Sequence, residues 1–201
     1  MKPSKVILLA TFTFLFHLHA YTQSVFIGDE SSKMGLETSM VLDKFHSSIS
    51  ISPHYTFKGF ITPMIQFGYI SSRNSDLSGY LIAPRLEVLI RKVNSEQRLG
   101  IGIEGTYRRF RYVRSGSQFS AINSGIVKGN LYSLIEIANQ AKLYPQISVG
   151  WLTNNIFSQA SRSVFLFGIG GCLIYRDTYL KLIADLGKSN STFRVSLGTF
   201  F

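Results

Sequence analysis

The amino-acid sequence predicts an all-β protein: a single closed antiparallel transmembrane β-barrel of about ten strands. Three observations predict this fold. Apolar and polar residues alternate with a period of two through most of the chain. Charged residues make up 16% of the sequence, below the roughly 25% that is usual for soluble domains. Beyond the N-terminal segment, no apolar run reaches the length of about 18 residues that a membrane helix requires. An apolar chain without such a run is typical of a spanning barrel, where every second residue is apolar.

Residues 1–24 are expected to be a cleavable signal peptide for Sec-dependent export. Two lysines precede the apolar stretch from Val6 to Phe16, which is too short to span a bilayer as a helix. Small and polar residues follow, and cleavage is favoured near Ser24. The alternative is an amphipathic anchor that the mature chain retains. Cleavage leaves residues 25–201 as one domain.

Composition narrows the possible partners. Removal of the first 24 residues takes away two lysines and no acid, so the formal net charge falls from +10 to +8. An exported chain rarely meets nucleic acid and no nucleic-acid motif occurs, so an anionic membrane surface is the better partner for this basicity. Cys172 is the only cysteine, which excludes an intrachain disulfide and a cysteine-ligated metal cluster. Only His46 and His54 remain as histidines, so no metal or other cofactor is expected.

Ten segments are expected to be strands. The alternation is clearest in residues 48–57, where isoleucine, proline and aromatic residues oppose serine, histidine and threonine. Residues 131–138 have a local propensity that also allows a helix. The predicted strands are residues 36–43, 47–57, 61–69, 80–92, 99–107, 129–138, 143–152, 163–175, 178–187 and 192–201.

The connections support this number of strands. Short connections at residues 58–59, 94–96, 139–142 and 176–177 alternate with polar ones at residues 71–79, 114–128, 153–162 and 188–191. Outer-membrane barrels alternate periplasmic turns and extracellular loops in this way. If the C-terminus is periplasmic, a strand must precede residues 47–57, and residues 36–43 supply it. Eight strands is the second possibility, in which residues 25–46 form an extended tail and one later strand is absent.

The alternation does not by itself decide which face points outward, because a soluble lipocalin-like barrel has the same period. The polar face is rich in Ser, Gly and Thr with few charges, whereas a solvated exterior usually carries many. Aromatic residues also gather near the strand ends, as expected for the two membrane interfaces. The two sets are Tyr55, Phe57, Phe60, Tyr144, Tyr175 and Tyr179 at one level, and Tyr69, Tyr80, Tyr107, Trp151 and Phe165 at the other.

The last strand carries a resemblance to a known family. Phe193, Val195, Leu197, Thr199 and Phe201 alternate with Arg194, Ser196, Gly198 and Phe200. This resembles the C-terminal signal of small bacterial outer-membrane β-barrel proteins, porin-like chains in which a terminal aromatic residue closes an amphipathic strand. Thr199 is more polar than this signal usually has. The resemblance implies an outer-membrane location and recognition of Phe193, Val195, Leu197 and Phe201 by the barrel-assembly machinery. The barrel is expected to be a monomer.

If the apolar residues point outward, a set of charged residues points into the lumen. A barrel of eight to ten strands has an interior just wide enough for side chains to fill. Because an unpaired buried charge costs several kcal/mol, we expect these charges to form a packed ion-pair network. The alternative is a narrow pore, whose pairs separate to pass small solutes. The predicted lumen residues are Arg85, Glu87, Arg91, Glu104, Arg108, Glu136, Lys181, Asp185 and Arg194.

A second group of basic residues is expected at the outer surface. Arg109, Arg111 and Arg114 follow the strand that begins at residue 99, and the first two share the parity of lipid-facing Tyr107. Placing an arginine at the membrane interface costs little free energy. Its guanidinium can form paired hydrogen bonds with the phosphates of lipopolysaccharide. We therefore predict that these arginines face lipopolysaccharide. The alternative is that they are solvated charges at the base of a loop.

Catalysis is not predicted. His54 shares a face with Ser50 and Ser52, but no third catalytic residue and no oxyanion donors can be assigned. Gly168, Gly170 and Gly171 lie inside a strand and are expected to relieve crowding in the lumen or to bend the strand. An outer-membrane lipid-modifying enzyme is the less favoured alternative. Two function classes remain: a structural or interaction barrel that binds lipid or partners, and a transport barrel.

Overall fold

The computed structural model describes residues 32–44, 46–73, 78–91, 93, 98–113, 121–154, 162–188 and 191–201. The predicted signal peptide, residues 1–24, lies outside these ranges. No helix in the described part of the chain is long and apolar enough to cross a membrane.

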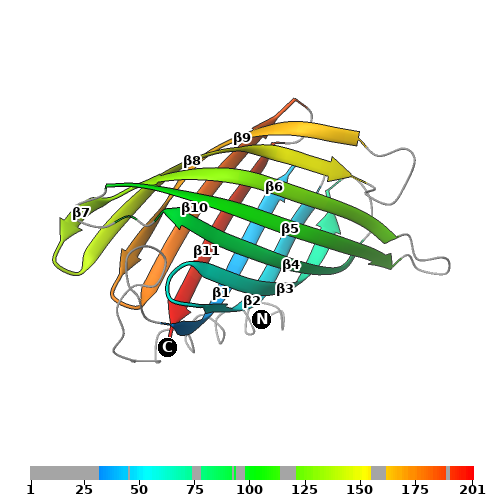
Figure 1. Ribbon diagram of the computed structural model, residues 1–201. Coiled ribbons are helices and arrows are strands. Elements are labelled where there is room, and N and C mark those ends of the chain that lie inside the picture. The colour runs from blue at the N-terminus through cyan, green and yellow to red at the C-terminus, as the bar shows by residue number, and fades with distance from the viewer. Residues whose placement is uncertain are drawn as a thin grey trace.

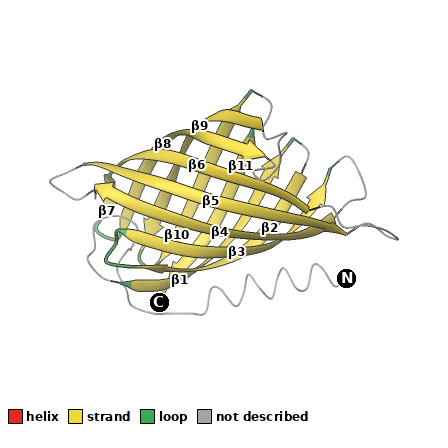
Figure 2. Cartoon of the chain, turned by 45° about the vertical axis from the view of Figure 1, so that its right-hand side comes forward, coloured by secondary structure: helices red, strands yellow, loops and turns green. Residues whose placement is uncertain are grey.

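Strands make up nearly all of the described residues (Figure 2). They are β1 (Lys33–Asp43), β2 (His46–Thr56), β3 (Ile61–Ser72), β4 (Ser78–Arg91), β5 (Leu99–Val113), β6 (Ala121–Ser133), β7 (Ile135–Ala138), β8 (Ala141–Asn154), β9 (Arg162–Tyr175), β10 (Thr178–Gly187) and β11 (Thr192–Phe200).

The strands close into a barrel (Figure 1). Each strand from β1 to β6 pairs antiparallel with the next, β6 pairs with β8, and the series continues from β8 to β11. The ring closes where β1 pairs with β11, from Gly35 opposite Phe200 to Asp43 opposite Thr192. This confirms the predicted antiparallel barrel and gives it ten strands rather than eight, with β7 as a short additional strand.

Strand β7 is an extension of β6 beyond the ring. Both pair with β8 in one register, Tyr132 opposite Gln146 and Ile135 opposite Leu143. The strand predicted at residues 129–138 is interrupted at Leu134, whose N–H bonds to the carbonyl of Arg98 at 3.1 Å. The β7–β8 hairpin therefore projects past the start of β5.

The predicted loop at residues 114–128 is wrong in its second half, because β6 begins at Ala121. The outward face of this strand has Gly125 and Gly129, while Ile126 is buried inside. Glycines where apolar side chains normally lie, and an isoleucine on the polar face, weaken the period-two pattern. The prediction depended on that pattern alone.

The two ends of the barrel differ. At one end, which we call the turn end, β1 begins, β11 ends, and residues 57–60 and 176–177 make tight turns. At the other end, which we call the loop end, the strands are connected through residues 73–77, 114–120 and 155–161. Lys58, Gly59 and Arg176 have positive φ values of 47°, 65° and 53°, as tight hairpin turns require.

Burial follows the predicted alternation with the apolar face outward. On β2, Ile49 and Ile51 are 51% and 45% exposed, whereas Ser50 and Ser52 are 2% and 1% exposed. Every strand of the ring exposes apolar side chains, and every one except β9 buries polar ones. A soluble barrel has the reverse arrangement, since exposed apolar area of this extent is unfavourable in water. The surface is therefore suited to lipid.

Candidate functional site

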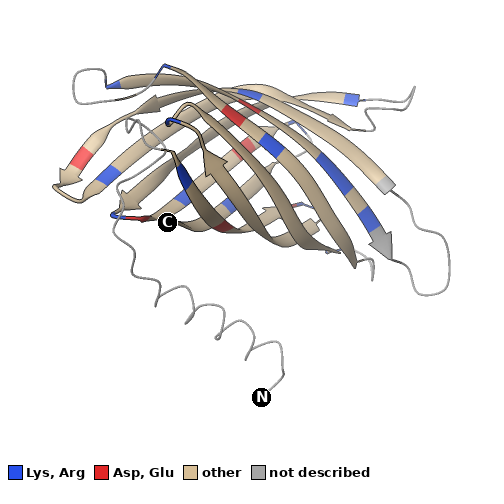
Figure 3. Cartoon of the chain, turned by 60° about the horizontal axis from the view of Figure 1, so that its bottom comes forward, with Lys and Arg blue, Asp and Glu red and all other residues tan. Residues whose placement is uncertain are grey.

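The candidate site is the interior of the barrel, and its first part is an ion-pair cluster on β4 and β5. Arg85 Nη2 lies 2.8 Å from Glu104 Oε2 and 3.6 Å from Glu87 Oε2. Thr106 donates to Glu104 at 3.3 Å, and the hydroxyl of Tyr132 donates to Glu87 at 2.5 Å. All five side chains are buried. Acidic and basic positions lie close together within the barrel wall in Figure 3.

A second ion pair crosses the lumen. Lys128 Nζ on β6 lies 2.5 Å from Asp185 Oδ2 on β10, and the strands β8 and β9 separate β6 from β10 in the ring. A Cβ at Gly168 would lie 2.6 Å from Asp185 Oδ1 and still closer to Ser148 Oγ. The missing side chain at Gly168 thus provides the space that Asp185 occupies.

Lys128 and Glu37 also face the lumen, although neither is among the lumen residues predicted from the sequence. Lys128 fell within the residues assigned to a loop. Glu37 on β1 is buried and accepts a hydrogen bond of 2.9 Å from the hydroxyl of Tyr179. Its parity, opposite to that of the outward Leu36 and Thr38, is a signal that could have identified it.

Three other predicted lumen residues face inward. Lys181 on β10 and Arg194 on β11 are buried, and Arg108 on β5 is partly buried. The structure does not bring Arg91 into this set. Leu89 pairs with Gly102 whereas Arg91 pairs with the outward Ile101, so a β-bulge reverses the parity at the end of β4. Arg91 is consequently exposed.

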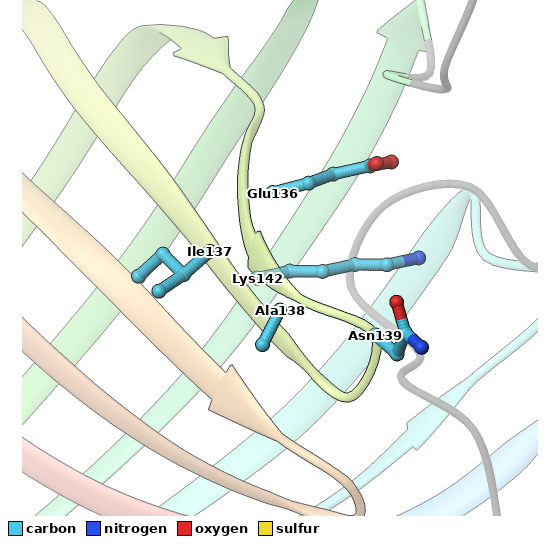
Figure 4. A pocket seen from close by; sticks show the side chains of 5 residues that line it. All are labelled: Glu136, Ile137, Ala138, Asn139 and Lys142. Atoms are coloured by element: carbon cyan, nitrogen blue, oxygen red, sulfur yellow. The ribbon is translucent and has the colours of Figure 1, made fainter.

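Glu136 also lies outside the lumen. It is exposed on β7 and pairs with Lys142, beyond the point where the first residue of β5, Leu99, pairs with Ser133. In Figure 4 the side chains of Glu136, Asn139 and Lys142 point to one side of the hairpin. Together with Ile137 and Ala138, they line an open cavity of about 540 Å³. The ring has ended at this level, so Glu136 has no opposite wall to face.

An aromatic plug, a cluster of buried side chains, lies in the lumen at the turn end. Tyr144 and Tyr179, which the sequence analysis assigned to the outer girdle, are each 1% exposed and lie inside. Their parity explains this, since Tyr144 aligns with inward Gln146 and Tyr179 with inward Lys181. Inward residues of β4, β6, β8, β9, β10 and β11 form the plug, with Val93 and Leu134 of the adjoining connections. Its members are Leu89, Val93, Tyr132, Leu134, Tyr144, Cys172, Ile174, Tyr179 and Phe200.

Two close contacts hold the plug together on the β11 side. The rings of Tyr179 and Phe200 have centroids 5.1 Å apart, and the ring of His54 meets Phe200 edge-on at 5.4 Å. Gly198 makes room for the Tyr179 ring, because a Cβ there would overlap it. His54 of β2 thereby extends the plug toward the remaining wall.

The other predicted girdle residues point outward. Tyr55, Phe57, Phe60 and Tyr175 are exposed toward the turn end. Toward the loop end, the exposed rings form cross-strand pairs: Tyr69 and Tyr80 with centroids 6.4 Å apart, and Trp151 and Phe165 at 5.8 Å. Tyr107 is partly exposed on the same face. Two levels of outward aromatic residues therefore remain.

The neighbours of His54 include a backbone carbonyl and two aromatic rings. Its Nδ1 lies 3.4 Å from the carbonyl oxygen of Ser52, and Ser50 Oγ is engaged instead by Ser39 Oγ at 2.8 Å and by Gln66 at 2.5 Å. The described residues contain no group of three or more His, Cys, Asp or Glu side chains placed to hold a metal ion.

The predicted surface residues lie as follows. Arg109 and Arg111 on β5 are exposed, opposite the outward Ile82 and Tyr80 of β4. Arg114 lies outside the described residues. Of the C-terminal set, Phe193 and Phe201 are exposed, and Val195 and Leu197 are partly exposed on the outer face.

No protein-family model and no curated protein matches the sequence. Solved structures of similar fold include a bacterial polysaccharide outer membrane secretin, with 6% identity, a TM-score of 0.50 and coverage of 87% of this chain and 67% of that one. They also include the translocator domain of autotransporter NalP from Neisseria meningitidis, with 13% identity, a TM-score of 0.41 and coverage of 98% and 95%. A third is the N-terminal β-barrel domain of Pseudomonas aeruginosa OprF, with 11% identity, a TM-score of 0.38 and coverage of 87% and 99%. The structural neighbours are outer-membrane β-barrels, and the likeness is one of fold.

Proposed function

We propose that this protein is an integral outer-membrane barrel with a closed lumen, a monomer that serves as a structural or interaction protein rather than as a pore or an enzyme. The observation that carries the proposal is the aromatic plug at the turn end. Its side chains come from six of the ten ring strands, β4, β6 and β8 to β11, and from the adjoining connections, and they are buried against one another. Packing of this kind leaves little room for a solute path at that level.

The ion pairs next to the plug support the same conclusion. In the pair of Arg85 with Glu104 and in the pair of Lys128 with Asp185, both side chains are buried. Separating a buried pair to open a path costs several kcal/mol, because each charge then lacks its partner. A narrow pore that opens by separating these pairs is the second candidate.

The outer surface supports contact with lipopolysaccharide. Arg109 and Arg111 lie in the loop-end part of β5, beside Tyr80 of the outward aromatic level. At this depth an arginine can extend to the interface, where its guanidinium pairs with lipid phosphate. Arg114, three residues further on in the sequence, lies outside the described residues and is included in the proposal from the sequence alone.

A non-enzymatic role fits the surroundings of His54. Its ring packs against Tyr179 and Phe200, and its Nδ1 faces a backbone carbonyl rather than a serine hydroxyl. A general base needs a nucleophile within hydrogen-bond reach. The surroundings therefore favour a packing role for this histidine.

Conductance in planar bilayers tests the closed lumen. The wild-type protein is expected to give no steady channel. The double variant Tyr144→Ala/Tyr179→Ala removes two plug rings and should conduct, whereas the control Tyr55→Ala/Tyr175→Ala removes two exposed rings at the same end and should not. Steady channels in the wild type would favour the narrow pore.

Fractionation tests the location independently. The mature protein should stay with outer membranes after a high-salt wash and migrate differently on gels when it is not boiled. Recovery as a soluble monomer without detergent would contradict the membrane location.

A further inference from the structure

Two arginines face each other across the loop-end half of the lumen. Arg108 is on β5 and Arg194 is on β11, and four strands separate β5 from β11 in either direction around the ring. The two strands are therefore diametrically opposite. Arg194 is 7% exposed, and Arg108 shares the inward face of Glu104 and Thr106. Arg194 lies two residues from the loop-end start of β11, and Arg108 lies nine residues above the turn-end start of β5.

Neither guanidinium has a carboxylate partner. Among the described residues, no Asp or Glu oxygen lies within 4.0 Å of either arginine. The buried acids have other partners: Glu37 accepts from Tyr179, Glu87 and Glu104 contact Arg85, and Asp185 contacts Lys128. At the rim, Asp43 accepts a hydrogen bond from the backbone N–H of His46 at 2.6 Å.

The inward face carries two arginines beyond the basic residues of the ion pairs. Arg108 and Arg194 face the lumen alongside Arg85 and Lys128, whose charges are paired with Glu104 and Asp185. The charged side chain with the largest electrostatic effect on Arg108 is Arg194, ahead of Glu104 and Asp185. Two like charges opposite each other in a barrel surrounded by lipid repel, and they call for a counter-charge.

We propose that the loop-end half of the lumen binds a small oxyanion of the phosphate or sulfate class between Arg108 and Arg194. Each guanidinium can present two parallel N–H groups to such an anion, a geometry that suits tetrahedral oxyanions. The buried hydroxyl of Ser196, two residues along β11 from Arg194, has no hydrogen-bond partner and supplies a further donor. The plug lies toward the turn end and both arginines lie toward the loop end, so the anion is expected to enter from the loop end.

Phosphate binding to the full-length barrel refolded in detergent tests this site. Titration calorimetry with inorganic phosphate should show binding to the wild type, and phosphate should raise its thermal unfolding temperature. Arg108→Gln and Arg194→Gln should each weaken binding about tenfold or more, because each removes a charge-assisted pair of donors. The control Arg162→Gln removes an exposed positive charge at the loop end and should bind as the wild type does.

A purely structural role for the arginines predicts a different pattern. If they bind an anion, Arg194→Gln should be no less stable than the wild type in phosphate-free buffer and should lose the phosphate-dependent shift. Should a Gln variant fail to fold, Arg108→Lys and Arg194→Lys offer a second test, because they keep the charge without the two parallel N–H groups of the guanidinium. These variants are expected to fold and to bind phosphate more weakly than the wild type. Equal phosphate binding by wild type and folded variants, or none by the wild type, would overturn the proposal.

A second arm identifies the source of the anion. Lipopolysaccharide that displaces inorganic phosphate from the wild type would assign the site to a lipid phosphate. Lipopolysaccharide that stabilises the wild type without displacing phosphate would assign it to a free anion. The site does not depend on a closed turn end, so channel formation by the wild type would leave the phosphate result unchanged.

Discussion

Lys128 on β6 and Asp185 on β10 form an ion pair of 2.5 Å that spans the lumen across two intervening strands. Neither residue is near the other in sequence, and Lys128 is beside Gly129 in a segment with weak alternation. The pair links two parts of the wall that are separated by β8 and β9, and both of its side chains are buried.

Breaking this pair on one side should destabilise the barrel strongly. Asp185→Asn leaves Lys128 buried without its counter-charge, and we expect a loss of about 3–5 kcal/mol in the free energy of unfolding. The double variant Lys128→Met/Asp185→Leu should recover most of it, because no charge remains buried. Urea unfolding in detergent measures both, with the partly exposed Lys142→Met as the control. A double variant as unstable as Asp185→Asn would contradict the assigned pairing.

The hydroxyl of Tyr179 should contribute more to the free energy of unfolding than the exposed hydroxyl of Tyr175. Tyr179→Phe removes the donor to buried Glu37 and keeps the ring in the plug, so the expected cost is about 1–3 kcal/mol. Tyr175→Phe, on an exposed ring, should change the free energy of unfolding little. Chemical denaturation compares the two, and equal effects would mean that the Tyr179 bond adds nothing to stability.

Gly198 should tolerate no side chain. Gly198→Ala places a Cβ within the space of the Tyr179 ring, so we expect overpacking to cost about 1–3 kcal/mol. Gly105→Ala is the matched control, since nothing lies within 4 Å of a Cβ at that position. Combining Gly198→Ala with Tyr179→Leu should restore part of the loss. Thermal unfolding followed by circular dichroism measures all three variants, and an unaffected Gly198→Ala would show that the ring can move aside.

The last two residues should have separable roles. Phe200 is buried in the plug, whereas Phe201 is exposed on the outer face. Phe200→Ala should lower the stability of the refolded barrel by about 3–5 kcal/mol, because it leaves a cavity. Phe201→Ala should lower membrane levels in cells more than it lowers stability in vitro, if the assembly machinery reads the terminal ring. Quantifying the protein in outer membranes and refolding it in detergent distinguishes the two, and equal membrane levels would remove the assembly role of Phe201.

Much of this molecule could be predicted from local sequence. Successive side chains of a strand point to opposite faces, so parity alone assigned Arg85, Glu104 and Asp185 to the interior and the isoleucines of β2 to the exterior. Tyr144 and Tyr179 were placed outside because they are aromatic residues near strand ends. The parity of these two residues along their strands predicts that they face inward, and this prediction agrees with the structure.

The tertiary structure decided which residues meet. Parity tells whether a side chain points into the lumen, but the ring order of the strands determines what it faces there. The pairing of Lys128 with Asp185, the opposition of Arg108 and Arg194, and the meeting of Tyr179 with Phe200 all depend on closure. The bulge that turns Arg91 outward also depends on pairing, because only the register with β5 shows an extra residue on β4. The face to which a side chain points is a local property of its strand. Contacts across the lumen depend on how ten strands close into one ring.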